Sequence, residues 1–141
     1  MILLDTNVVS EPMRRRPDYR VQEWLDAQAA ETLCLSTISL SELLLGIASL
    51  PVGRRRSGLA VALEQRIVSL FEDRLIPFDV AAAEAYAKVV TLARGNGYAI
   101  SIADGQIAAI AASRSYSIAS RDEAPFQAAG LDVINPWTAE P

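Results

Sequence analysis

The sequence predicts an α/β fold in which helices flank a five-stranded parallel sheet. Short apolar runs of strand length alternate along the chain with longer runs that have helical periodicity. Strands that alternate with helices pair in parallel through crossover connections. The chain has 141 residues, of which 51% are hydrophobic, enough for one core. We therefore expect a single domain over residues 1–141.

Five apolar runs are the predicted strands, at Ile2–Leu4, Leu33–Leu35, Arg74–Phe78, Ser117–Ala119 and Val133–Ile134. Asp5-Thr6-Asn7 is expected to close the first of them. Helices are expected between the strands, at about 19–29, 40–49, 59–72, 80–95, 102–114 and 123–129. Asp79 is a suitable N-cap for the fourth helix, and Gly95-Asn96-Gly97 is a strong stop signal after it.

The composition excludes several kinds of chemistry. The chain has no histidine, which removes imidazole ligands and every catalytic triad that uses histidine. Its one cysteine, Cys34, excludes a thiolate zinc site and an internal disulfide. No apolar run approaches the roughly 18 residues that span a bilayer, and no basic segment marks a secretory signal. We expect a cytoplasmic protein without a membrane association, whose chemistry depends on oxygen groups or a bound hard cation.

Four acidic residues are expected to meet at one edge of the sheet. Asp5 directly follows the first predicted strand, and Asp122 follows the fourth. Glu42 and Asp104 are expected in the first turns of two helices, which begin at the same edge. In open parallel sheets the functional crevice lies beyond the carboxyl ends of the strands. The four acids are therefore the predicted catalytic and metal-binding residues.

Each acid also has a plainer structural interpretation. Glu42 stands three residues after Ser39, and Asp104 three residues after Ser101, which is the spacing of a capping box. Asp5 and Asp122 could be turn formers that accept hydrogen bonds from nearby amides. These interpretations do not predict a shared edge, and a capping role is compatible with metal binding.

A cluster of carboxylates requires a counter-charge. Two carboxylates about 4 Å apart repel by roughly 4 kcal/mol at an effective dielectric constant of 20. Mg²⁺ or Mn²⁺ relieves this repulsion, prefers oxygen ligands and activates water for attack on a phosphodiester. The sequence thus predicts hydrolysis of a phosphodiester with Mg²⁺ (or Mn²⁺) as the cofactor.

Four motifs in this order resemble the PIN-domain toxins of the VapC/FitB type, and the resemblance extends to the closing Asn135-Pro136-Trp137. The motifs are Ile2-Leu3-Leu4-Asp5-Thr6-Asn7, Ser41-Glu42-Leu43 with Gly46, Ala103-Asp104-Gly105-Gln106-Ile107-Ala108-Ala109, and Ala119-Ser120-Arg121-Asp122 with Phe126.

The resemblance implies a three-layer α/β/α sandwich and a Mg²⁺- or Mn²⁺-dependent ribonuclease whose acidic quartet is Asp5, Glu42, Asp104 and Asp122. It further implies that Thr6, Asn7 and Ser120 support the metal site. A small antitoxin is expected to block the site through an exposed apolar groove, and the chain is expected to form a homodimer.

Arginines are the candidate contacts for RNA. The chain has 13 basic and 17 acidic residues; setting aside the four clustered acids leaves 13 of each. The candidates are two triplets expected in loops and one residue beside Asp122, namely Arg14, Arg15, Arg16, Arg54, Arg55, Arg56 and Arg121. The plainer interpretation is that the triplets are solvated loop charges and that Arg121 balances local negative charge.

Two other classes of protein share some of these features. A phosphoacceptor domain also places aspartates at strand ends, but it needs a lysine near the phosphate, and the only lysine, Lys88, is expected in mid-helix. A dehalogenase-like phosphatase would have a second acid where this chain has Asn7. A catalytically inactive PIN-like module that binds RNA or protein would have lost one or more of the four acids, and all are present.

Overall fold

The computed structural model describes residues 1–141 as five strands and seven α-helices joined by short turns. The strands are β1 (Ile2–Leu4), β2 (Leu33–Ser36), β3 (Leu75–Ile76), β4 (Ser117–Ala119) and β5 (Val133–Ile134). The helices are α1 (Thr6–Ser10), α2 (Tyr19–Ala27), α3 (Thr37–Ala48), α4 (Arg54–Ala62), α5 (Val80–Gly95), α6 (Ile102–Arg114) and α7 (Glu123–Ala128). A π-helical stretch, Leu63–Val68, continues α4.

All five strands are parallel, in the order β3-β2-β1-β4-β5. The chain proceeds outward from β1 to β2 and β3, then returns to the other side of β1 to form β4 and β5. Leu4 at the end of β1 lies opposite both Leu35 of β2 and Ala119 of β4. The strand order therefore reverses between β1 and β4, and the predicted parallel sheet is confirmed.

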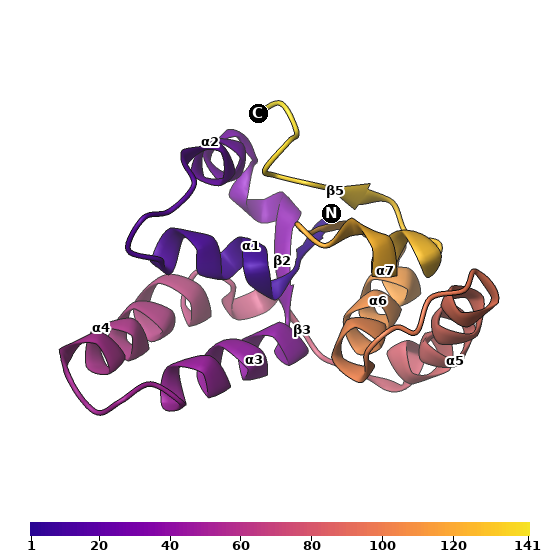
Figure 1. Cartoon of the computed structure of the whole chain (residues 1–141), viewed down its shortest axis with the longest axis horizontal. Coiled ribbons are helices and arrows are strands. Elements are labelled where there is room, and N and C mark those ends of the chain that lie inside the picture. The colour runs from indigo at the N-terminus through magenta and orange to yellow at the C-terminus, as the bar shows by residue number, and fades with distance from the viewer.

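Helices cover both faces of the sheet, as Figure 1 shows: α1 to α4 lie on one side and α5 to α7 on the other. Alternating strand residues supply the two cores, because successive side chains point to opposite faces. Leu3 and Cys34 pack in the cluster with α5 and α6. Leu4 and Leu35 pack in the cluster with α1, α2 and α3. The predicted three-layer α/β/α sandwich is thus confirmed.

No helix in the structure combines the length and the apolar character needed to cross a membrane.

The structure corrects the predicted start of α3. The Ser36 hydroxyl accepts a hydrogen bond of 2.9 Å from the Ser39 amide, so the helix begins at Thr37 rather than near residue 40. The predicted capping box of Ser39 and Glu42 is wrong, because Ser36 is the cap. Glu42 consequently lies in the second turn of α3, where its side chain is free for other partners.

Asp5-Thr6-Asn7 closes β1 as expected, and it does so as the start of helix α1, which Asp5 caps by accepting a hydrogen bond from the Thr6 amide. One further local prediction is wrong. The triplet Arg54–Arg56, expected in a loop, is the first turn of α4 after Gly53. Arginine favours helices almost as strongly as alanine, and the breaking signal lies before the triplet, at Pro51 and Gly53.

Gly105 is the residue that lets α6 pack closely on α5. A Cβ at this position would lie 3.0 Å from a ring carbon of Tyr86 and 3.1 Å from a methyl carbon of Val90. We expect Gly105→Val to lower the free energy of unfolding by about 1–3 kcal/mol through overpacking. Gly46→Val is the matched control, because a Cβ on Gly46 of α3 meets nothing within 4 Å. Urea denaturation measures both variants, and equal losses would contradict the packing role.

Candidate active site: carboxylates at the carboxyl edge of the sheet

Asp5 is the fixed centre of the site. Its backbone amide donates a 2.8 Å hydrogen bond to the Ala119 carbonyl of β4. Its side chain uses both oxygens: Oδ1 accepts from the Thr6 amide at 2.8 Å, and Oδ2 accepts from the Ser120 hydroxyl at 2.7 Å. Asp5 is only 6% exposed. The carboxylate is therefore held at the point where the strand order reverses, the expected place for a functional crevice in a parallel sheet.

Ser120 connects the ends of β1 and β4. It is fully buried, and while its hydroxyl donates to Asp5 it also accepts from the Asp122 amide at 3.0 Å. Asn7 adds a second link, since its Oδ1 accepts from the Arg121 amide at 3.3 Å and its Nδ2 lies 3.5 Å from the Ser120 hydroxyl. These contacts fix the start of the loop after β4, which contains Asp122.

Thr6 joins Asp5 to Glu42. While its amide donates to Asp5, its hydroxyl donates to Glu42 Oε1 at 2.7 Å. This contact links the start of α1 to the second turn of α3, and it gives the otherwise exposed Glu42 side chain a definite position. The resemblance named Thr6 only as a supporting residue. The local sequence signal, an Asp-Thr pair directly after a strand, indicates a helix start but not the distant partner.

The Asp122 carboxylate makes no hydrogen bond within the chain, and the Asp104 carboxylate has a contact only with the Ser101 hydroxyl. Ser101 caps α6 as expected, because its hydroxyl accepts from the Asp104 amide at 3.1 Å. No return bond runs from the Asp104 carboxylate to the backbone, so the full capping box does not form. Asp122 occupies the N-cap position of α7 without a side-chain capping bond. Both carboxylates thus remain available to a ligand.

Burial and mutual repulsion shift Asp5 and Asp104 toward the protonated form. Burial, opposed by the hydrogen bonds from Ser120 and Thr6 and aided by the negative charges of Asp104 and Glu42, raises the pKa of Asp5 to about 6. The Asp5 carboxylate is thus poorly stabilised by the protein alone.

Asp104 shows the same effect. Burial raises its pKa, the hydrogen bond with Ser101 opposes the rise, and the charges of Asp122 and Glu42 add to it. Each of the four acids therefore lies within the electrostatic field of at least one other, as expected for residues that converge on one edge.

The donor set suits a hydrated hard cation. No three acidic side chains are grouped closely enough to enclose an ion by themselves. Mg²⁺ usually keeps several waters and binds through only one or two carboxylates, so it does not need such a cage. The available side-chain donors near Asp5 are carboxylate, hydroxyl and amide oxygens, which hard cations prefer. Positive charge here would also oppose the repulsion that raises the pKa values of Asp5 and Asp104.

Arginines from both triplets reach the edge of the site. A cleft of about 260 Å³ is lined by Thr6 and Glu42 together with Arg14 and Arg55. The other four triplet arginines do not line it. Arg55 lies in the first turn of α4 rather than in the predicted loop. It therefore lines the same cleft as Arg14, which precedes it by about forty positions.

Arg121 lies over an aromatic ring next to the site. Its guanidinium carbon is 5.3 Å from the ring centroid of the buried Trp137, in cation–π geometry. Trp137 in turn donates its amide hydrogen to Asn135. The side chain of Arg121 is therefore anchored to the C-terminal segment, and it forms no ion pair with an acid.

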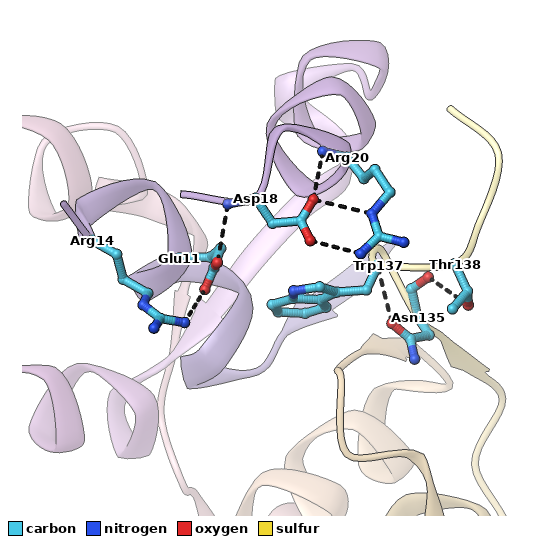
Figure 2. A network of polar contacts seen from close by, with 7 residues as sticks. All are labelled: Glu11, Arg14, Asp18, Arg20, Asn135, Trp137 and Thr138. Carbon is cyan, nitrogen blue, oxygen red and sulfur yellow. Dashed lines mark hydrogen bonds and ion pairs between the residues drawn. The ribbon is translucent and has the colours of Figure 1, made fainter. Parts of the chain in front are cut away.

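Glu11 is a buried acid that the sequence analysis did not single out. It is 5% exposed, and it accepts hydrogen bonds from the Asp18 amide at 3.1 Å and from Arg14 at 3.3 Å. Figure 2 shows these contacts beside the Asp18–Arg20 ion pair and Trp137. No local pattern distinguishes Glu11 from a solvated acid, because its burial depends on the loop that folds over it.

The chain matches the PIN domain family model over residues 2–131. It is 51% identical to the plasmid stability protein StbB of Pseudomonas syringae pv. tomato over 99% of this chain and 100% of that protein. It is 46% identical to VapC ribonuclease Y4jK of Sinorhizobium fredii (97% and 98%) and 47% identical to toxin FitB of Neisseria gonorrhoeae (97% and 99%).

Among solved structures, the fold is similar to that in a crystal structure of FitAcB from Neisseria gonorrhoeae. The TM-score is 0.94 and the sequence identity 46%, with 99% of this chain and 100% of that chain covered. The match over nearly the full length includes both helical layers and the edge of the sheet where the acids meet.

The raised pKa of Asp5 predicts how stability depends on pH without divalent cations. The carboxyl titrates near 3.8 when unfolded and at about 6 when folded, so the folded state binds more protons between these values. Its contribution to stability is full below 3.8 and is lost as the pH rises through 6. We expect Asp5→Asn to be more stable than the wild type at alkaline pH by about 1–3 kcal/mol, with little difference at acid pH.

Urea denaturation in EDTA across this pH range measures the effect. The exposed Asp132 provides the control Asp132→Asn, for which we expect the difference from wild type to vary little with pH. An Asp5→Asn variant no more stable than wild type at alkaline pH would show that the site already accommodates the charge.

Proposed function

The chain belongs to the PIN-domain family, and from this premise we propose that it is a metal-dependent endoribonuclease, the toxin of a type II toxin–antitoxin pair. The observation that carries the proposal is the convergence of Asp5, Glu42, Asp104 and Asp122 on the point where the strand order reverses. The relatives named VapC ribonuclease and toxin FitB support the activity and the biological role.

The proposed mechanism assigns distinct tasks to the acids. Asp5, Glu42 and Asp104 would hold the principal ion, and Asp122 would complete the cluster or help to hold a second one. When bound, Mg²⁺ or Mn²⁺ supplies Lewis acidity and lowers the pKa of a water that attacks the RNA phosphate. Ser120 and Thr6 orient the Asp5 carboxylate, and Thr6 also orients Glu42, so these ligands are positioned before the substrate arrives.

A catalytically inactive PIN-like module that binds RNA or protein is the alternative. The electrostatics of the site disfavour it. A buried Asp5 with a pKa of about 6 destabilises the folded protein at neutral pH, and a module with no need of a cation gains nothing from retaining it. The four acids are better explained by a function that requires them.

We propose that the protein partner, a small antitoxin, docks in an apolar cleft of about 500 Å³ beside α2 and the Leu63–Val68 stretch. Leu25, Ile67 and Leu70 are among its lining residues. Met13 lines both this cleft and the smaller one that contains Glu42. A segment seated in the apolar cleft could therefore extend past Met13 to the acids, where it would block the substrate.

We also propose that the chain forms a homodimer. Leu44 and Leu45 on α3 are 52% and 68% exposed, and adjacent exposed leucines are a surface that association with a second copy would remove from water.

The nuclease proposal predicts that Mn²⁺ or Mg²⁺ supports cleavage of mixed RNA and that EDTA abolishes it. We expect Asp5→Asn to reduce cleavage more than about 100-fold, because the loss of a ligand exceeds the effect of losing a supporting contact. The variant should remain folded, and Asp132→Asn should cleave normally. Full activity of Asp5→Asn would contradict the mechanism.

A second readout does not depend on cleavage. Mn²⁺ should raise the melting temperature of the wild type, by mass action, and should have little effect on Asp5→Asn. A folded wild-type protein that neither binds Mn²⁺ nor cleaves RNA would favour the inactive module.

The docking proposal predicts that a charge in the apolar cleft prevents neutralisation by the antitoxin. Leu70, which is 53% exposed, provides the variant Leu70→Glu. We expect nuclease activity to persist and inhibition by the copurifying antitoxin to weaken at least tenfold, since burying an unpaired carboxylate is costly. Val61, 52% exposed on α4 and outside the cleft, provides the control Val61→Glu. Equal inhibition of both variants would place the antitoxin elsewhere.

A further inference from the structure

We propose that Arg14 and Arg55 form a phosphate-binding subsite that holds the RNA backbone beside the scissile linkage. The subsite is the cleft of about 260 Å³ that is lined by Glu42, one of the four acids. This inference rests on the proposed nuclease function, and it assigns the substrate path to one side of the site, toward α3 and α4.

The cleft is continuous with the acid cluster. Thr6 and Glu42 line it, and the same two side chains are hydrogen-bonded to each other within the site. The lining comes from α1, α3 and α4, together with Arg14 just after α1, and Figure 1 shows the three helices on the same side of the sheet. An RNA strand with one phosphate at the acids would enter this cleft with a neighbouring phosphate.

The triplet arginines are largely without acidic partners. The ion pairs of the chain involve Arg14, Arg20, Arg74 and Arg114. Of the six triplet arginines, only Arg14 therefore has an acidic partner, in a chain with 17 acidic residues. Arg55 is exposed and has none, so its guanidinium is available to an anion.

The start of α4 provides an independent indication of an anionic ligand. Its first turn contains three arginines and no acid, and Gly53 at the N-cap position offers no side-chain hydrogen bond. The N-terminal end of a helix has a partial positive charge, which normally favours acids and disfavours bases. Three cations there repel both the helix end and one another, and a bound phosphate would relieve that repulsion.

A contact with a buried acid holds the side chain of Arg14 in place. The buried Glu11 accepts a hydrogen bond from its guanidinium and another from the Asp18 amide, as Figure 2 shows. A guanidinium has five N–H donors, and this contact uses one of them. Arg14 can therefore keep its contact with Glu11 and still donate to a phosphate.

The chemistry of the lining favours recognition of the backbone rather than the bases. Guanidinium groups donate paired hydrogen bonds to phosphate oxygens. Apart from Glu42 at the end next to the site, the rest of the lining is apolar or hydroxyl-bearing, with Met13, Leu43 and Ile47 among its residues and no aromatic or amide side chain. Proteins that select bases in single strands usually stack them on aromatic rings and bind their edges. We therefore expect the subsite to contribute affinity without sequence preference.

Binding to an RNA analogue tests the subsite independently of cleavage. The probe is a fluorescent single-stranded oligonucleotide with 2′-O-methyl riboses, and the measurement is anisotropy in Mg²⁺ at several salt concentrations. We expect Arg55→Ala and Arg14→Ala each to weaken binding about tenfold. Each should also lower the slope of log affinity against log salt by about 0.7, the value for one phosphate contact on a single strand.

Two control variants separate a subsite from a diffuse positive surface. Arg94→Ala removes an exposed arginine from α5, on the other side of the sheet. Arg54→Ala removes the neighbour of Arg55 that does not line the cleft. We expect both to change affinity less than threefold, and a loss with Arg54→Ala equal to that with Arg55→Ala would overturn the proposal.

Neutral linkages locate the contacted phosphate on a cleaved RNA. Single methylphosphonates, which lack the negative charge, are placed in turn on either side of the scissile linkage. In the wild type, one position should lower kcat/KM about tenfold, whereas Arg55→Ala should be insensitive at that position. Equal sensitivity of the two proteins at every position would overturn the subsite.

The remaining outcomes separate this inference from the proposed function. If the wild type cleaves no RNA but the probe binding depends on Arg55 and Arg14, the subsite stands and the nuclease assignment fails. If the variants bind the probe normally but lose the antitoxin, the cleft holds an acidic protein segment and the proposal is overturned.

Discussion

The central position of β1 is the constraint on which the site depends. Because β4 pairs with β1 in parallel register, the residues that follow the two strands must lie side by side. Asp5 therefore meets Ser120, and the two side chains share a hydrogen bond of 2.7 Å although 115 positions separate them. The Ser120 hydroxyl also accepts a hydrogen bond from the Asp122 amide. One buried serine at the end of β4 therefore bonds to two of the four acidic residues.

This arrangement places a carboxylate where the fold alone stabilises it poorly. Two hydrogen bonds favour the charged form of Asp5, yet burial outweighs them and its pKa remains at about 6. A structural aspartate with such partners would normally have a lowered pKa. The unfavourable charge therefore lies at the point where the proposed divalent cation would bind. Without the cation, this charge lowers the stability of the fold, which is the cost expected of a functional site.

The sequence predicted the parts of the site that follow from local pattern. Asp5 directly follows an apolar strand, and Asp104 follows a serine at capping distance, so both were located correctly relative to their elements. Glu42 was expected in the first turn of its helix but lies in the second. The error arose because Ser36 and Ser39 are both suitable N-caps, and only the tertiary fold decides between them. The start of α4 was missed because three arginines have no apolar periodicity. The presence of Arg14 and Arg55 in one cleft depends on how α1 and α4 pack against α3, which no local pattern encodes.

The distribution of charge resolves an apparent conflict between an acidic chain and the proposed RNA substrate. A net charge of −4 would repel RNA if it were spread evenly. Four of the acids, however, converge where a cation would offset them, and the adjoining cleft is lined by Arg14 and by Arg55, which has no acidic partner. Screening limits charge effects to about 8 Å at physiological salt, so a phosphate in that cleft responds to the nearby guanidinium groups far more than to acids on distant helices. The local placement of charged side chains, rather than the net charge of the chain, then determines where the RNA strand would lie.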